Sequence, residues 1–323
     1  MPSIRATGAD ARFIAAFEAA YGVDPAANYH QLLCSSFDPG RQPQLGYETE
    51  LGQGDEDTDP FYEGARFRPT FGVHMGIDSF GFWLKTLMGA PVTTGSGPFT
   101  HTFGSTGDPP SFAFEEGDVG LASAIYWLML GTVMGGMSID LSPKGVAKAN
   151  FTAFAKTRSK GGATAEGSPT AYSTSGVYKY FNKNSKVQWN GADVGQAMSG
   201  SLNYTTGAEE VETMRGDGQI EGVDDGSHGA TGQLRIRRSA ASGMYDDAVA
   251  ETPRALKLIW TTAVNAAYKL ELTFPKAYLD ISGGGLPGPG GIDDLYNFRA
   301  AKASGGRVMT AVLINGVAGS VYA

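Results

Sequence analysis

The strongest pattern in this chain is an alternation of apolar and polar positions within residues 132–156. The apolar positions are Met137, Ile139 and Leu141 before a short break, and Ala149, Phe151 and Ala153 after it. A period of two is that of a β-strand with one dry and one wet face. The break, Pro143-Lys144-Gly145, suits a tight turn, because Pro presets a negative φ and Gly accepts a positive one. The segment therefore predicts a long β-hairpin.

The same period predicts a second long hairpin over residues 255–262 and 267–274. Shorter segments with strand character are residues 66–75, 98–103, 111–116, 232–238 and 307–315. Residues 122–130 are apolar enough for a strand or a helix, and periodicity leaves the two open. The chain is thus predicted to be mainly β, folded as a β-sandwich or a partly closed barrel.

Three segments have helical spacing instead. Residues 9–20 place Phe13, Ile14 and Phe17 on one side and precede a Gly and a Pro, so they predict a helix. Residues 79–89 predict a short apolar helix that plugs the end of a sheet sandwich and stops at its final Gly. Residues 242–250 predict a third short helix.

Both halves of the chain show one order of elements: a strand, an acidic Gly-rich loop, a strand, a short helix and a long hairpin. The two acidic loops are residues 46–64 and 207–229. Between the halves, residues 157–176 are of low complexity, and their length is typical of a boundary or a flexible element. The chain therefore divides into a first β unit with an N-terminal arm at 1–156, a flexible loop at 157–176 and a second β unit at 177–323. A single large β domain stays open as the alternative, because the halves share no apparent sequence identity.

Composition and charge narrow the possible functions. The chain has 46 Gly among 323 residues and only 18% charged residues, which fits many strands joined by turns. A net charge of -8 argues against a protein that grips nucleic acid, and it suits a surface that repels phosphate. Cys34 is the only cysteine, which excludes an intrachain disulfide and favours a buried, unreactive thiol. No signal peptide and no apolar run of 18 residues is apparent, so we expect no membrane insertion.

The sequence carries no recognisable catalytic or metal-binding motif. Its four histidines, at positions 30, 74, 101 and 228, have none of the spacings of a metal site, and GxSxG, CxxC and P-loop patterns do not occur. Asp55, Asp57 and Asp59 alternate as calcium ligands do, but Pro60 occupies the position where an EF-hand loop needs Gly. The four tryptophans lie within apolar alternation, which favours core packing over a sugar-binding face. We therefore expect no enzymatic activity, no cofactor and no metal.

Several segments together resemble the major tail-tube proteins of long-tailed, siphovirus-like bacteriophages. YEGARFRPTFGVHMGIDSFGFWLKTLMG matches that family's strand and short helix, and residues 83–89 resemble its LLK..LG ending. GGMSIDLSPKGVAKANFTAFAK matches its polar-faced hairpin, and LKLIWTTAVNAAYKLELTFPKAYLD contains an l.l.FP strand at residues 270–275. A final strand ends in VLING. The order covers residues 45–316, and the chain departs from the family pattern after Lys156 and at 283–291.

The resemblance implies a structural virion protein that self-assembles into stacked rings forming the tail tube. The inner sheets of a ring would join into one β-barrel around the channel through which the genome is delivered. Its partners would be further copies of itself and the tape-measure, tail terminator and distal tail proteins, with DNA only in transit. Two tandem units would need three copies per ring and a single unit six, and we favour three. The protein would be assembled in the host cytoplasm and reside in the virion tail.

Candidate site residues follow from the two polar hairpin faces. The channel-facing candidates are Ser138, Asp140, Lys148, Asn150 and Thr152 in the first hairpin and Lys269, Glu271 and Thr273 in the second. The opposite face stays open, because alternation distinguishes two faces without saying which one meets the channel. Contacts between rings are expected at the chain termini and at the acidic loop 46–64, with Asp55, Glu56, Asp57 and Asp59 as candidates.

Two other classes of protein remain as alternatives. A carbohydrate-binding or other β-rich tail accessory protein would need exposed rows of aromatic side chains. An outer-membrane β-barrel would show a signal peptide, repeated ten-residue alternating segments and usually a terminal aromatic residue, whereas this sequence ends Val321-Tyr322-Ala323.

Overall fold

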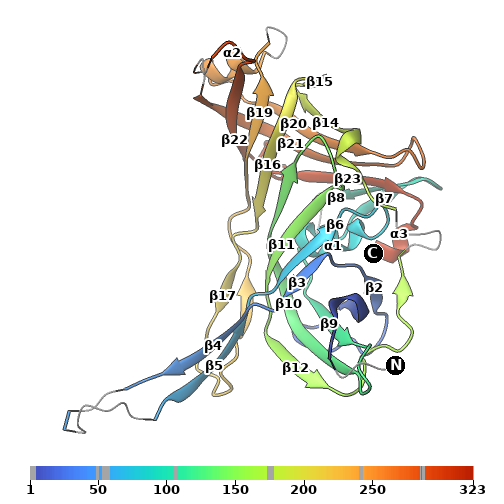
Figure 1. Ribbon diagram of the computed structural model, residues 1–323, viewed down its shortest axis with the longest axis vertical. Coiled ribbons are helices and arrows are strands. Elements are labelled where there is room, and N and C mark those ends of the chain that lie inside the picture. Colours follow the sequence, from blue (N-terminus) through green and yellow to red (C-terminus); the bar gives the residue numbers. More distant parts are fainter. Residues whose placement is uncertain are drawn as a thin grey trace.

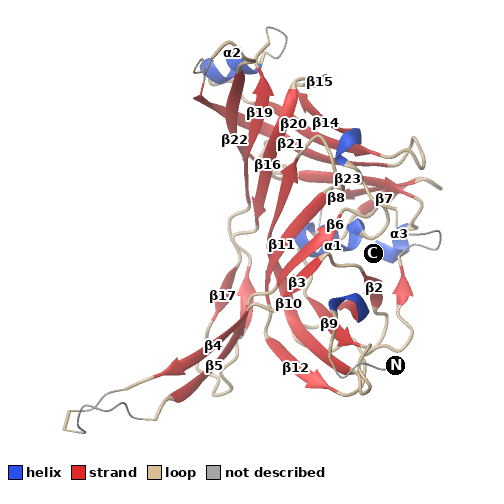
Figure 2. Ribbon diagram, viewed as in Figure 1, coloured by secondary structure: helices blue, strands red, loops and turns tan. Residues whose placement is uncertain are grey.

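The computed structural model shows β-sheets built around one buried helix, and it describes residues 5–48, 51–52, 59–104, 108–172, 178–239, 243–283, 285 and 288–322. Strands make up 51% and helices 9% of the chain, and the helices are short (Figure 2). The predicted mainly β fold is therefore confirmed.

The largest sheet, termed the polar sheet, runs antiparallel in the order β3-β6-β11-β10-β16-β19-β22-β21 (Figure 1). Its strands are β3 (Ser36–Asp38), β6 (Thr70–His74), β10 (Ile125–Leu141), β11 (Lys148–Phe154), β16 (Ala197–Thr205), β19 (Gly229–Arg237), β21 (Lys269–Gly283) and β22 (Asp293–Ala301). One face is apolar and buried, and the other is polar and largely exposed.

Two smaller sheets pair with the ends of the long strands. The second sheet has the order β15-β14-β20-β21-β23-β8-β7. The third sheet has the order β13-β2-β1-β9-β10-β12. Their further strands are β1 (Ala11–Phe17), β2 (His30–Leu32), β7 (Val92–Thr94), β8 (Phe99–Phe103), β9 (Phe112–Asp118), β12 (Thr157–Gly161), β13 (Thr170–Ala171), β14 (Ser185–Trp189), β15 (Ala192–Asp193), β20 (Arg254–Thr261) and β23 (Thr310–Asn315). Following the pairings of the described strands never leads back to a strand already passed, so the chain by itself closes no barrel.

Two hairpins and five short helical segments complete the part of the chain that the structure describes. β4 (Arg41–Gly46) and β5 (Phe61–Phe67) form an arm that projects from the body, and β17 (Glu209–Val211) and β18 (Gly222–Asp224) form a hairpin beside its base (Figure 1). The helices are α1 (Phe80–Met88), α2 (Met244–Val249) and α3 (Gly319–Tyr322), with 3-10 turns at Gly8–Asp10 and Asn182–Asn184.

Strands β10 and β21 each pass from one sheet into another. β10 turns at Gly131, whose φ of 64° is left-handed and whose N–H donates to the Glu18 carboxylate instead of to a neighbouring strand. The register with β9 shifts at the same point. β21 turns at Pro275, which has no N–H to leave unpaired, and its register with β20 shifts there. The corners let each long strand pair with different neighbours along its length.

Helix α1 fills the space that the sheets enclose, and all nine of its residues are buried. Trp83 stacks on Phe151 of β11 at 5.2 Å between ring centroids, and Phe82 packs edge-on against Phe112 of β9 at 5.7 Å. Lys85 is buried too, with its ammonium 4.0 Å from the centre of the Phe17 ring. The predicted plug helix at 79–89 is thus confirmed.

The predicted helix at residues 9–20 is wrong, because residues 11–17 form strand β1 in the middle of the third sheet. Both faces of β1 are covered: Ile14 and Ala16 pack with Tyr29 on one side, while Ala15 joins the main core on the other. A strand that is covered on both faces has apolar residues at consecutive positions instead of alternate ones. Such a run cannot be distinguished from a buried helix by periodicity.

Residues 157–172 are also more ordered than their composition predicts. β12 pairs with the first half of β10, and β13 pairs with β2. Between them, Glu115 accepts hydrogen bonds from Thr164 Oγ1 at 2.7 Å and from the Ala165 N–H at 2.7 Å. The predicted flexible loop is therefore held to the third sheet over this part, and residues 173–177 lie outside the described residues.

Phe71 lies at the centre of the aromatic core, within 6.3 Å of the rings of Phe37, Trp83, Phe112 and Phe114. We expect Phe71→Ala to lower the free energy of unfolding by about 3–5 kcal/mol, because it leaves a cavity among rings that cannot close in. Urea denaturation followed by tryptophan fluorescence measures the change. Phe61→Ala, at a 43% exposed position on the arm, is the control and should change stability by less than about 1 kcal/mol.

Candidate functional site

The polar sheet presents a continuous wet face, and the five first-hairpin candidates lie on it. Ser138 of β10 stands opposite Asn150 of β11 and opposite Asn203 of β16. Asp140, Lys148, Asn150 and Thr152 are exposed and Ser138 is half-buried. The register continues through polar residues on both sides, which are Ser36, Thr70, Thr152, Ser201, Asn203, Thr205, Thr231, Gln233, Asn297 and Arg299.

The three second-hairpin candidates lie elsewhere. Lys269, Glu271 and Thr273 belong to the part of β21 before Pro275, which pairs with β20 and β23 in the second sheet. Within the polar sheet, the positions that correspond to the first hairpin are supplied by the later half of β21 and by β22. Alternation continues through the corner of β21 without marking it, so the sequence pattern does not show that its two halves lie in different sheets. Their role as channel-facing residues stays a prediction.

Glu271 is the centre of an ion-pair cluster rather than a free surface group. Its carboxylate is 2.7 Å from Lys257 Nζ and 3.0 Å from Lys269 Nζ, and it accepts a hydrogen bond from Thr273 Oγ1. Burial alone would raise the pKa of Glu271, but the hydrogen bonds from the two lysines outweigh burial and hold the pKa below its usual value. The cluster fastens β20 to β21.

The charge of the polar face is mixed. Asp140, Asp280 and Asp38 are interspersed with Lys148 and Arg299 along the outward positions. The chain's overall excess of acidic residues is therefore not concentrated on this face. Small polar side chains separate the charges, so the face offers no continuous basic track of the kind that holds a phosphate backbone.

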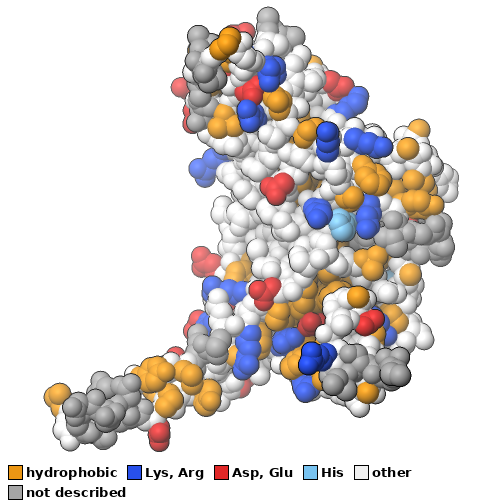
Figure 3. Space-filling model, viewed as in Figure 1, with side chains coloured by type: hydrophobic (Ala, Val, Ile, Leu, Met, Phe, Trp, Pro, Cys, Tyr) orange, Lys and Arg blue, Asp and Glu red, His pale blue; other side chains and the backbone are white. Residues whose placement is uncertain are grey.

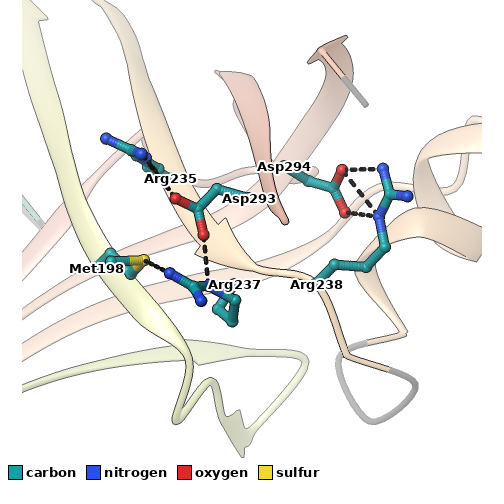
Figure 4. A network of polar contacts seen from close by, with 6 residues as sticks. All are labelled: Met198, Arg235, Arg237, Arg238, Asp293 and Asp294. Atoms are coloured by element: carbon teal, nitrogen blue, oxygen red, sulfur yellow. Dashed lines mark hydrogen bonds and ion pairs between the residues drawn. The ribbon is translucent and has the colours of Figure 1, made fainter. Parts of the chain in front are cut away.

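A network of three arginines and two aspartates clamps the far end of the polar sheet (Figure 4). Arg235 and Arg237 of β19 bind the two oxygens of Asp293 on β22 at 2.7 and 2.6 Å. Burial would raise the pKa of Asp293, but these hydrogen bonds outweigh it and lower the pKa. Arg238 binds both oxygens of the buried Asp294. The network fixes β22, and with it the outer strand β21.

The projecting arm carries an unusual amount of exposed apolar surface (Figure 3). Tyr62 on β5 is 85% exposed, and Leu51, which follows β4 in the chain, is 106% exposed. Leu45, Tyr47 and Phe61 are exposed as well. An apolar hairpin held out in solvent is costly for an isolated monomer and is typical of a surface that meets a partner.

The base of the arm is held to the β17–β18 hairpin by charge and by close backbone packing. Arg68 binds Glu210 at 2.8 Å, and Arg66 binds Glu212. Gly64 has a φ of 115°, and a Cβ there would lie 2.6 Å from the Gly218 carbonyl oxygen, so only glycine permits this approach. These contacts set the direction of the arm.

Of the inter-ring candidates, Asp59 is exposed just before β5, whereas Asp55, Glu56 and Asp57 lie outside the described residues. Sequence reasoning singled out their charge and missed the apolar side chains of Leu51 and Tyr62. The sequence did contain a sign of this exposure. The segments that form β4 and β5 lack the regular alternation that is typical of strands with one buried face.

A family model for phage tail tube proteins matches residues 8–300, which is most of the chain. The chain belongs to the phage tail tube protein family. A tail tube chain is a structural component of the phage tail and of the virion, and this family is not one of enzymes. Such chains self-assemble and meet other tail components. A comparison with curated proteins found no match.

The tryptophans and the cysteine of this tail tube chain pack against other side chains. Trp83, Trp189 and Trp260 are buried, and the Arg158 guanidinium lies 4.2 Å from the centre of the Trp127 ring, so the tryptophans form no open sugar-binding row. Burial raises the pKa of the Cys34 thiol to about 12, which leaves it unreactive at neutral pH. Within the described ranges, no three His, Cys, Asp or Glu side chains come together as a metal site. No helix in that part of the chain is both long and apolar enough to cross a membrane.

We expect Glu271→Gln to lower the free energy of unfolding at neutral pH by roughly 1–3 kcal/mol, because two lysines lose their charged partner. The lowered pKa of Glu271 means that its contribution is complete above the unfolded pKa, near 4.5, and is lost as pH falls through the folded value. The difference between the two proteins should therefore be constant from pH 7 to about 5.5 and shrink at lower pH. Urea denaturation across this range checks it, and a pH-independent difference would contradict the ion-pair explanation.

Proposed function

We propose that this chain is a tail-tube subunit made of two tandem tube units, and that three copies form each ring around a channel for genome delivery. The observation that carries the proposal is the repeated strand order of the polar sheet. The order β3-β6-β11-β10 is followed by β16-β19-β22-β21, and the last two strands of each set come in reversed chain order.

The correspondence between the two sets extends through the fold. β3 and β16 each precede a separate two-stranded hairpin, β6 and β19 each follow it, and α1 and α2 come next in the chain. β10 and β21 are the long corner strands, which pair before their corners with β9 and β20. β9 pairs with the hairpin β1–β2, and β20 pairs with the hairpin β14–β15. This shared order supports two tandem units.

The number of strands favours three copies. Three polar sheets supply 24 strands, and at about 4.8 Å between strands tilted by about 40°, they form a ring about 50 Å across between backbones. Such a barrel is wider than a porin of 16–18 strands, whose lumen already holds water. Six copies would double the width, which leaves a much larger opening than a single DNA duplex needs.

The wet face of the polar sheet is the proposed channel wall, with Ser138, Asp140, Lys148, Asn150 and Thr152 among its residues. Its apolar face packs on the subunit's own core, so the polar face is the one left to line a ring. Short polar side chains and charges of both signs let a duplex pass without strong binding.

The experiment that tests the proposal is negative-stain electron microscopy of the purified chain across a concentration series. We expect rings or tubes with an open axial channel and three-fold symmetry. Six-fold rings built from six chains would contradict the tandem-unit proposal, and a monodisperse monomer at every concentration would contradict the ring itself.

The arm is the proposed contact between stacked rings. Tyr62→Glu and Leu51→Glu should leave rings intact and reduce tube length at least tenfold, because an unpaired carboxylate buried in the contact costs several kcal/mol. Tyr62→Phe is the matched control and should form tubes normally. Tube lengths measured in micrographs and circular dichroism spectra of the variants check the prediction, and full-length tubes from Tyr62→Glu would exclude the arm as the stacking contact.

A further inference from the structure

A cavity of about 580 Å³ lies between strand β2, helix α3 and the turn that joins β20 to β21. Helix α1 separates this cavity from the polar sheet, because its Trp83 stacks on Phe151 of β11 while its Phe82 contacts Tyr172 in the cavity wall. Figure 1 shows α3 and β2 on the other side of α1 from β11 and β16. In the proposed ring, with the polar sheet inward, the cavity would therefore face outward.

The charged and unpaired polar groups of the cavity are able to accept hydrogen bonds. Asp78 supplies a carboxylate, and none of the described lining residues is a lysine or an arginine. His30 Nδ1 is buried without a hydrogen-bond partner, so the hydrogen bond of this ring to the Thr170 backbone uses Nε2–H. Burial lowers the pKa of His30, which keeps the ring neutral and leaves Nδ1 as an acceptor at neutral pH. The hydroxyl of Tyr172 is also buried without a partner.

The remaining walls are aromatic and aliphatic. Tyr178 and Tyr268 line the cavity, and Tyr178 is 44% exposed. Val264, Val317 and Val321 add apolar surface. The face of an aromatic ring attracts a cation, and aliphatic surface takes up a hydrocarbon chain from water. The cavity therefore combines groups that suit a charged donor with groups that suit an apolar chain.

The polar groups are held in place by their neighbours. The Tyr172 ring stacks between His30, at 4.5 Å between ring centroids, and Tyr322, at 5.9 Å. Lys85 of α1 does not line the cavity, and its ammonium lies 4.0 Å from the centre of the Phe17 ring. The cavity is thus a formed site that needs no rearrangement of the sheets around it.

We propose that this cavity binds a primary alkylammonium group, either of a free aliphatic amine or of a lysine side chain in a partner protein. An ammonium has three N–H donors and no acceptor, which matches the Asp78 carboxylate, His30 Nδ1 and the Tyr172 hydroxyl. Its alkyl chain would lie against the valines, and an anionic ligand would be repelled by Asp78. Binding by the unassembled chain does not depend on the proposed ring.

Isothermal titration of the purified full-length chain tests the proposal with two amines, 1-aminopentane and N-acetyl-lysine methylamide. We expect binding that is about tenfold or more stronger than that of the neutral analogues 1-pentanol and N-acetyl-norleucine methylamide, which keep the chain without the charge. Binding of one amine alone supports the site and identifies a free amine or a peptide lysine as its source. No binding of either amine, or equal binding of the neutral analogues, would overturn the proposal.

Three variants locate the binding. Asp78→Asn removes the carboxylate charge and Tyr178→Ala removes an exposed ring, and each should weaken amine binding by about tenfold. Asp280→Asn is the matched control, because it removes the same charge from the wet face of the polar sheet and should leave binding unchanged. Circular dichroism shows whether each variant is folded, and Tyr178→Ala decides the matter if Asp78→Asn does not fold. Unchanged binding in a folded Tyr178→Ala would exclude this cavity as the site.

The outcomes separate this site from the proposed function. Amine binding by a chain that forms no rings in micrographs would leave the site standing and remove the ring. Rings formed by a chain that binds neither amine would do the reverse.

Discussion

The structure depends on two strands that each belong to two sheets. A strand that leaves one sheet for another must break its hydrogen-bond ladder, and each broken N–H needs a new partner or must be absent. β10 meets this requirement at Gly131, whose N–H donates to Glu18, and β21 meets it with Pro275. These corners carry the polar sheet along one side of the core while the second and third sheets close over helix α1.

The corners also explain how one chain presents a wide polar face without a closed barrel. One half of each of β10 and β21 pairs within the third or the second sheet and buries apolar surface. The other half belongs to the polar sheet, and in β21 that half has one unpaired edge. Edges of this kind are a hazard for a monomer, because any other strand can add to them. The chain belongs to a family whose members self-assemble with other tail components.

Charge in this protein is used mainly to hold elements in place. Asp293 and Asp294 fix the end of the polar sheet through three arginines, Glu271 fastens β20 to β21, and Glu210 holds the base of the arm. The exposed arm is instead apolar at Tyr62 and Leu51. The charged clusters thus make contacts within the subunit, whereas the apolar side chains of the arm are available to a partner.

The sequence alone determined the local features: the two long hairpins, the buried helix at 79–89, the mainly β fold, and the polar face with Ser138 and Asn150. These features follow from the periodicity and composition of short segments, which depend only on residues that are close together in the sequence. The tertiary structure decided the rest. It made residues 11–17 a strand, because both of its faces are covered, and it placed Glu271 in an inner sheet and Tyr278 in the polar sheet, because the corner at Pro275 lies between them. Periodicity states which residues share a face, but only contacts between distant segments decide what that face meets.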